Sequence, residues 1–229
     1  MTVKSYILQR LGGAFETALL MPSGIKKFDG TPRETLLSFL VLVISIPLSY
    51  ISISTFPPLG THDIETIKVV GVHRFSWAIS FLIGLGMIYA FARYVTGGNT
   101  QKIWLYYTLA NWVTLLFIPL NSFFLFLYAQ GVFADKTLTD VYLVIRLYGY
   151  LIGGFVIYRV FNPPWELAAA MACFFLVMGQ VVLKTSYVIF DFPLVDYMQV
   201  YGPTAMERAA EEAARAAAAA AETAGNGGE

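Results

Sequence analysis

The chain has 229 residues, of which 57% are hydrophobic and only 13% are charged. With a mean hydropathy of +0.64, this composition is typical of an integral membrane protein and lies outside the range of soluble domains. The 15 basic and 15 acidic residues cancel, so the charge balance gives no indication of a nucleic-acid partner, and the single cysteine, Cys173, excludes an internal disulfide.

Residues 1–34 form a charged N-terminal segment that precedes the first long apolar stretch. Within it, residues 3–20 carry apolar side chains at helical spacing on one face and polar side chains on the other. This pattern predicts an amphipathic helix at the bilayer surface, with an ordinary packed helix as the alternative. The apolar face holds Val3, Ile7, Leu11, Ala14, Phe15 and Ala18, opposite Lys4, Gln9, Glu16 and Thr17.

The motif Thr31-Pro32-Arg33-Glu34 predicts the start of the next helix. Thr31 can cap the helix, and Pro32 fits the first helical position, where no amide hydrogen is needed. Glu34 can then complete a capping box with Thr31. The apolar run that follows, residues 35–55, is long enough to cross about 30 Å of hydrocarbon, and Pro47 is expected to kink it.

Further apolar stretches predict an all-α polytopic transmembrane bundle of about five spans within residues 35–190. The connection after the first span is predicted as a loop, with His62 and His73 solvated and too far apart to suggest a metal site. Residues 191–229 predict a polar tail with an alanine-rich helix and a disordered end. The remaining spans are predicted at residues 75–95, 103–128, 141–161 and 165–190, the last two joined by a tight Asn162-Pro163-Pro164 corner.

Glycines within the predicted spans are the candidate packing positions, because a residue without a side chain lets a neighbouring helix approach closely. They are Gly84, Gly86, Gly149 and Gly153.

The basic residues predict the orientation of the chain. With five spans, the face that holds the N-terminus receives eight basic residues and the opposite face receives five. Since cytoplasmic loops carry the excess of lysine and arginine, the N-terminus is expected in the cytoplasm and the C-terminus outside. The expected location is a bacterial inner membrane.

Ionisable and amide side chains inside spans are costly, so they are the candidate functional residues. Arg146 can also snorkel to the surface, Glu166 can stabilise a helix start and pair with Arg159, and Lys184 is followed two turns later by Asp191. The alternatives for these side chains are a transport pathway or structural anchoring. Asn111 and Asn121, with Pro47 and Pro119, could similarly mark broken helices that line a polar cavity.

Catalytic motifs are missing from the sequence. It contains no phosphate-binding P-loop, GxSxG elbow, HExxH helix or dinucleotide fingerprint. We therefore expect a protein that is not an enzyme and that uses no cofactor and no metal; an intramembrane enzyme with an unfamiliar site is the third alternative.

The segment IKKFDGTPRETLLSF at residues 25–39, together with five closely spaced spans, resembles the Yip-type family of small membrane proteins. The resemblance covers roughly residues 10–190 and rests on Pro22, Phe28, Asp29, Ser38 and Phe39. It implies a five-span fold. Eukaryotic members look like trafficking factors that engage small GTPases, but the short N-terminal segment here has no evident GTPase-binding region, so that activity is not carried over.

Together these patterns favour a non-enzymatic scaffold, assembly factor or accessory subunit, embedded in lipid and associated with a membrane-protein partner or with itself. The spans supply packing groups but few convergent reactive ones. The alternative is a small transporter or permease subunit, with Lys184 and Asn111 near its pathway.

Overall fold

The computed structural model describes residues 3–55 and 65–191, and over these ranges the chain is entirely helical, with no strand. The predicted tail, residues 191–229, lies outside the described residues apart from Asp191, as does His62. The seven helices are α1 (Val3–Ala18), α2 (Pro22–Ile25), α3 (Pro32–Thr55), α4 (Thr66–Thr96), α5 (Thr100–Ala129), α6 (Asp135–Phe161) and α7 (Trp165–Ile189).

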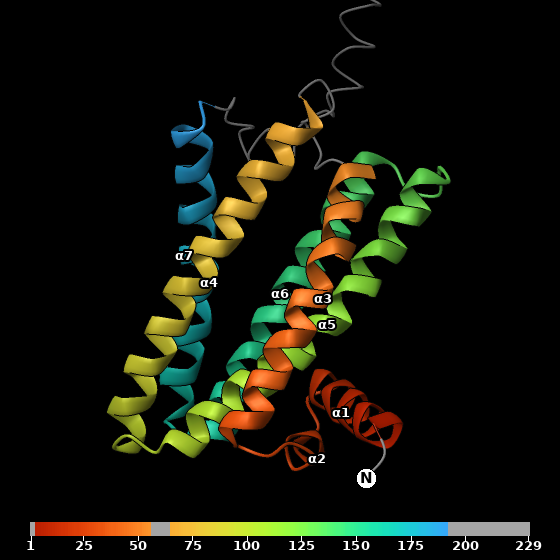
Figure 1. Ribbon diagram of the computed structural model, residues 1–229. Helices are drawn as coiled ribbons and strands as arrows, with labels where there is room; N and C mark the ends of the chain where they lie inside the picture. Colours follow the sequence, from red (N-terminus) through yellow and green to blue (C-terminus); the bar gives the residue numbers. More distant parts are fainter. Residues whose placement is uncertain (1–2, 56–64, 192–229) are drawn as a thin grey trace, which may run out of the picture.

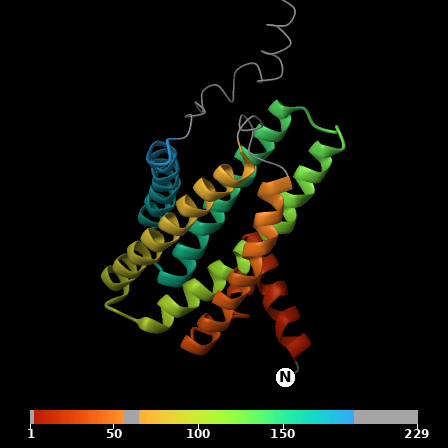
Figure 2. The ribbon, with the colours of Figure 1, turned by 45° about the horizontal axis from the view of Figure 1, so that its top comes forward.

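The five long helices lie side by side and alternate in direction along the chain (Figure 1). α3 packs mainly against α5, α6 lies between α5 and α7, and α4 packs mainly against α7. The short α1 and α2 lie at one end of these helices, as the second view also shows (Figure 2). We call this the α1 end; it contains the start of α3 and α5 and the end of α4. The opposite end, with the start of α4 and the end of α7, is the far end.

Four of the helices are long and apolar enough to cross a membrane, so the prediction of a helical membrane protein is confirmed at this level. They cover Ile67–Thr96, Thr100–Tyr128, Lys136–Phe161 and Trp165–Ile189.

Two helix boundaries, the start of α3 and the corner between α6 and α7, lie where the sequence predicts them. The amide of Glu34 donates to Thr31 Oγ1 at 3.3 Å, so Thr31 caps α3 as predicted. The Glu34 carboxylate, however, accepts from the amide of Asp29 at 2.8 Å rather than closing the box on Thr31. At the Pro163-Pro164 corner, Asn162 adopts a left-handed conformation with φ 57°, which ends α6 and lets α7 return beside it.

α4 begins at Thr66, well before residue 75, where the second span is predicted to start. The reason is helical spacing: Val69 and Val72 are three residues apart and both are buried against Tyr187 of α7. His73 therefore lies in a helix and is partly buried, so its prediction as a solvated loop residue is wrong.

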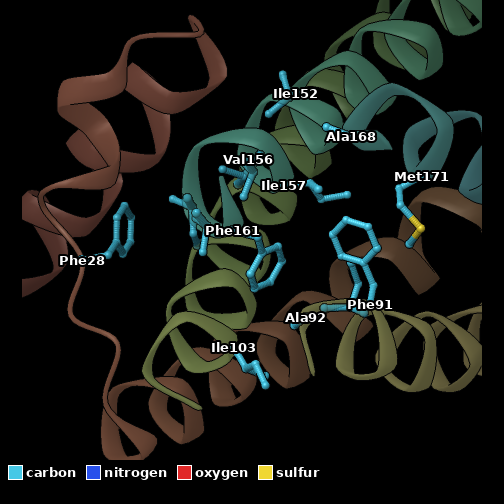
Figure 3. Close-up of a cluster of buried hydrophobic side chains, with 14 of the residues drawn as sticks. Phe28, Phe91, Ala92, Ile103, Ile152, Val156, Ile157, Phe161, Ala168 and Met171 are labelled. Atoms are coloured by element: carbon cyan, nitrogen blue, oxygen red, sulfur yellow. The ribbon is translucent and has the colours of Figure 1, made fainter. Parts of the chain in front are cut away.

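The largest hydrophobic core lies at the α1 end. Side chains from α4, α5, α6 and α7 turn toward one another there, with Phe28 of the α2–α3 connection at the margin (Figure 3). At the far end, the buried cluster that packs α4 on α7 is small, with Val69, Val72 and Tyr187 and the partly buried Leu183.

α1 is held against the bundle rather than lying free on a surface. Arg10, Gly13, Ala14 and Thr17 are buried. Thr17, predicted on the polar face, is wholly buried, and its hydroxyl donates to the carbonyl of Gly13. Phe15 keeps an exposed side, so α1 is both packed and apolar on its outer face.

Candidate functional site

Arg10 is the centre of the most elaborate polar arrangement at the α1 end. Only 5% of its surface is exposed, and its Nε lies 2.6 Å from Oε1 of Glu34, which is equally buried. Its Nη2 donates to Oδ2 of Asp29 at 2.9 Å. The guanidinium also lies over the rings of Tyr6 and Phe28, at 5.0 and 5.5 Å from their centroids. The positive charge is thus matched by carboxylates on one side and aromatic faces on the other.

Glu34 precedes the first predicted span, and its ionisation is sensitive to this arrangement. Burial raises the pKa of Glu34 to about 7, against the opposing effects of the Arg10 charge and of the hydrogen bond from the Asp29 amide. The carboxyl group is therefore poised to gain or lose a proton near neutral pH.

A second ion pair fixes the other side of α1 to the segment that follows α2. Lys27 Nζ contacts Glu16 Oε1, and the Ser23 hydroxyl donates to Glu16 Oε2 at 3.0 Å. Both donors hold the pKa of Glu16 below its ordinary value. Each end of the loop between α1 and α3 is thereby tied to α1.

Three glycines at the α1 end, Gly13, Gly24 and Gly30, allow neighbouring segments to approach closely. A Cβ on Gly24 would lie 2.5 Å from the Gly13 carbonyl oxygen and 2.6 Å from the Thr17 amide nitrogen. A Cβ on Gly30 would collide with the backbone of Gln101, at the start of α5. No residue with a side chain fits at Gly24 or Gly30 without a shift of the backbone.

A buried polar ladder joins α3 to α5. The Thr35 hydroxyl donates to the Trp104 carbonyl at 3.0 Å and lies 2.9 Å from the Thr108 hydroxyl. One turn further, Asn111 Nδ2 donates to Ser38 Oγ at 2.9 Å. Asn111 is 5% exposed, so it joins two helices instead of facing a polar cavity.

The five predicted functional residues are not brought together into one site. Glu166 lies exposed in the first turn of α7, and Arg159 stacks on Phe155 and Tyr158 instead of pairing with it. Lys184 is exposed on α7 and, within residues 3–55 and 65–191, forms no ion pair with Asp191. Arg146 is exposed on α6. Asn121 has a buried side-chain oxygen that no described donor satisfies.

Polar contacts also join the helices at the far end. His73 Nε2 lies 3.1 Å from the hydroxyl of Tyr187, which links α4 to α7. Arg74 Nη2 donates to the Ile46 carbonyl at 2.7 Å, directly before Pro47 of α3. Both contacts bind one helix to another.

The predicted packing glycines divide into two pairs. A Cβ on Gly84 would lie 3.7 Å from the Phe175 ring, and one on Gly149 would lie 3.7 Å from the Phe117 ring. Beside Gly86 and Gly153, a Cβ would meet nothing within 4 Å. The first pair packs within the chain, whereas the second faces open space.

No sequence pattern directly indicates the Arg10 network. In the sequence Arg10 is one basic residue of the N-terminal segment, although it lies on the same helical face as Ala14 and Thr17. Gly13 and Gly24 lie outside the predicted spans, so the packing rule for glycines in spans does not point to them. The glycine content of residues 10–30, unusually high for a packed helical segment, was the available signal.

The residues that support the Yip-type resemblance lie around this end of the molecule. Phe28 and Asp29 contact Arg10, Ser38 accepts from Asn111, and Phe39 lies against the rings of Phe81 and Tyr107. Within the described residues, no cluster of histidine, cysteine and carboxylate side chains could hold a metal. Comparisons of this chain with models of known families, with curated proteins and with solved structures gave no match.

Proposed function

We propose that this chain is a non-enzymatic membrane protein of about five spans that acts as a scaffold, assembly factor or accessory subunit. The supporting observation is that polar side chains bond within the chain, whereas apolar side chains face outward. At the α1 end, polar groups are bonded within the chain by Arg10, Glu34 and Asn111. Wide apolar helix faces, in contrast, turn outward, so the surface offered to partners is mostly apolar.

Residues 35–55 of α3, after Glu34, are the proposed fifth span. The whole helix has 24 residues and extends about 36 Å at 1.5 Å per residue, and the part from residue 35 onward is long enough to cross about 30 Å of hydrocarbon. From Leu36 onward, the helix contains no ionisable group of Asp, Glu, Lys or Arg type. Five spans place the two termini on opposite faces, and the basic residues then favour a cytoplasmic N-terminus in a bacterial inner membrane.

Lys184 supports a role that depends on a partner. It belongs to an exposed stripe on α7 that also contains Cys173, Val177, Val181 and Val188. These positions are separated by three or four residues, so they share one helical face. A cation on such a face is stabilised by an anionic group from outside the chain, such as a carboxylate on a partner helix.

The test uses Cys173, which is the one cysteine in the sequence and is exposed on this stripe. A photo-crosslinker attached to Cys173 in native membranes should give a discrete adduct with a partner or a second copy. The same probe at Val144, on the exposed side of α6, in a Cys173→Ser background is the matched control. A chain that yields no adduct from either face, and that purifies in mild detergent as a lone monomer, would contradict the proposal.

The second candidate is a small transporter or permease subunit. Its specific support is Asn121, two residues after Pro119, whose buried side-chain oxygen accepts from no donor within residues 3–55 and 65–191. A transport pathway through Lys184 and Asn111 is disfavoured, because Lys184 lies on an outward face of α7 and the amide of Asn111 is bonded to Ser38. Flux in proteoliposomes that the unchanged chain supports and that falls in Asn121→Ala would favour the transporter instead of the scaffold.

A further inference from the structure

α1 has three distinct sides, which is one more than an ordinary amphipathic helix has. The first side is buried against the bundle and centres on Arg10, Gly13, Ala14 and Thr17. The second side is polar and contains Gln9 and Glu16. The third side is apolar but exposed, and it is formed by Ile7, Leu8 and Phe15, with Leu19 directly after the end of the helix; their exposed fractions are 41, 60, 58 and 53%.

The orientation of these three sides is fixed by contacts in the middle of α1 and at its C-terminal end. Arg10 is held by Glu34 and Asp29, and the Tyr148 hydroxyl of α6 donates to the Ala18 carbonyl at 2.6 Å. α1 therefore cannot roll to bury its apolar side without breaking a buried ion pair. That side is a permanent surface of the folded chain.

The apolar side of α1 continues into the outer face of α6. Tyr148, which bonds to the end of α1, lies on α6 among the exposed residues Val144, Leu147 and Leu151. α6 is one of the helices able to span a membrane. The two apolar surfaces thus meet at Tyr148 and would contact the same hydrocarbon layer, while Gln9 and Glu16 turn toward water.

The charges around α1 complement an anionic surface. The acidic residues of this segment are all engaged: Glu16 by Lys27, and Asp29 and Glu34 by Arg10. Three basic residues, Lys4, Lys26 and Arg33, are exposed and form no ion pair within the described part of the chain. The segment therefore presents a positive charge beside an apolar surface.

We infer that α1 and α2 form a rigid interfacial anchor that binds the anionic phospholipid headgroups of one leaflet. The apolar side of α1 enters the boundary between headgroups and acyl chains, and Lys4, Lys26 and Arg33 contact phosphates. This anchor goes beyond the proposed scaffold function, because it needs no protein partner. It sets how deeply and at what angle the α1 end sits in the membrane.

The depth of α1 can be measured in the full-length protein. Single cysteines at Leu8 or Phe15, and at Gln9 as the matched neighbour, are introduced with Cys173→Ser and spin-labelled. The protein is reconstituted in vesicles of phosphatidylcholine with phosphatidylglycerol. Labels at Leu8 and Phe15 should collide with oxygen dissolved in lipid, and the label at Gln9 with a water-soluble nickel complex. Equal access to nickel at all three sites would overturn the inference, because the apolar side would then face water.

Lipid preference is the second measurement. Association of spin-labelled phosphatidylglycerol, relative to phosphatidylcholine, should fall by roughly fivefold for each of Lys4→Gln, Lys26→Gln and Arg33→Gln. Lys68→Gln and Lys136→Gln, at the far end, are the matched controls and should have less effect. An unchanged lipid preference in the variant that carries all three substitutions, Lys4→Gln, Lys26→Gln and Arg33→Gln, would overturn the headgroup assignment.

In the depth measurement, spin labels at Leu8 and Phe15 that are shielded from both oxygen and nickel would show that a second copy of the chain, and not lipid, covers the apolar side of α1. Neither measurement depends on the crosslinking result at Cys173.

Discussion

The two ends of the molecule are built differently, although the same five long helices pass through both. At the α1 end, a continuous core, three ion pairs among the described residues and close glycine contacts connect α1 and α2 to the start of α3 and α5. At the far end, α4 meets α7 through the small cluster around Tyr187 and meets α3 through Arg74. Length and hydropathy alone therefore do not determine how a helical membrane protein packs. Close backbone contacts and matched buried charges are concentrated at the α1 end.

The largest expected effect comes from removing the charge at the centre of the α1 end. Arg10→Met leaves the buried carboxylate of Glu34 without its cation, so at pH 8 the free energy of unfolding should fall by about 3–5 kcal/mol. Unfolding in mixed detergent micelles, followed by circular dichroism, measures this loss. Lys4→Met, on an exposed position of the same helix, should change stability by less than about 0.5 kcal/mol. Equal losses in the two variants would mean that the ion pair does not hold the α1 end together.

The pH dependence of stability should come mainly from Glu34. Its pKa in the folded chain, about 7, is raised above the ordinary value of 4.5. The folded chain therefore binds this proton more tightly than the unfolded chain does. The resulting stabilisation is complete below pH 4.5 and is lost as the pH rises through about 7, by up to about 3 kcal/mol. Glu34→Gln should remove this slope, and a slope that persists in the variant would assign the titration to another group.

The next largest loss of stability is expected where a glycine is closely packed against the backbone of another segment. Gly24→Ala places a methyl group against the Gly13 carbonyl and the Thr17 amide, so we expect a loss of about 1–3 kcal/mol. Gly86→Ala is the matched control, because a Cβ there meets nothing within 4 Å. Alanine favours a helix more than glycine does, so Gly86→Ala should be neutral or up to about 1 kcal/mol more stable. Thermal unfolding of both variants and of the unchanged chain in the same detergent measures these changes in stability.

The sequence predicts the helical class and the capped start of α3 because these depend on local patterns: long apolar runs, and Thr31 with Pro32 at a helix start. It does not predict the Arg10 network, since the contacts of Arg10 with Asp29 and Glu34 appear only after α1 folds back along α3. The sequence marks Asn111 as an unusual polar residue inside a span, but its partner Ser38 lies 73 residues away in the sequence. Polarity at a position can be read from sequence, whereas the partner that satisfies it depends on which helices pack together.

The smallest expected losses of stability come from removing single hydrogen bonds between helices. Asn111→Leu removes the donor to Ser38 between α3 and α5, and Tyr187→Phe removes the hydroxyl that faces His73 between α7 and α4. Hydrogen bonds of this kind contribute about 0.6 kcal/mol on average in membrane helices, with a maximum near 1.7 kcal/mol. Asn111 is buried in a ladder with Thr35, Thr108 and Ser38, so its loss should approach the upper value. Tyr187→Phe keeps the ring that packs on Val69 and Val72 and should cost about 0.5 kcal/mol. Unfolding of the two variants in mixed micelles decides the order. A larger loss of stability for Tyr187→Phe than for Asn111→Leu would mean that the stronger of the two hydrogen bonds lies at the far end.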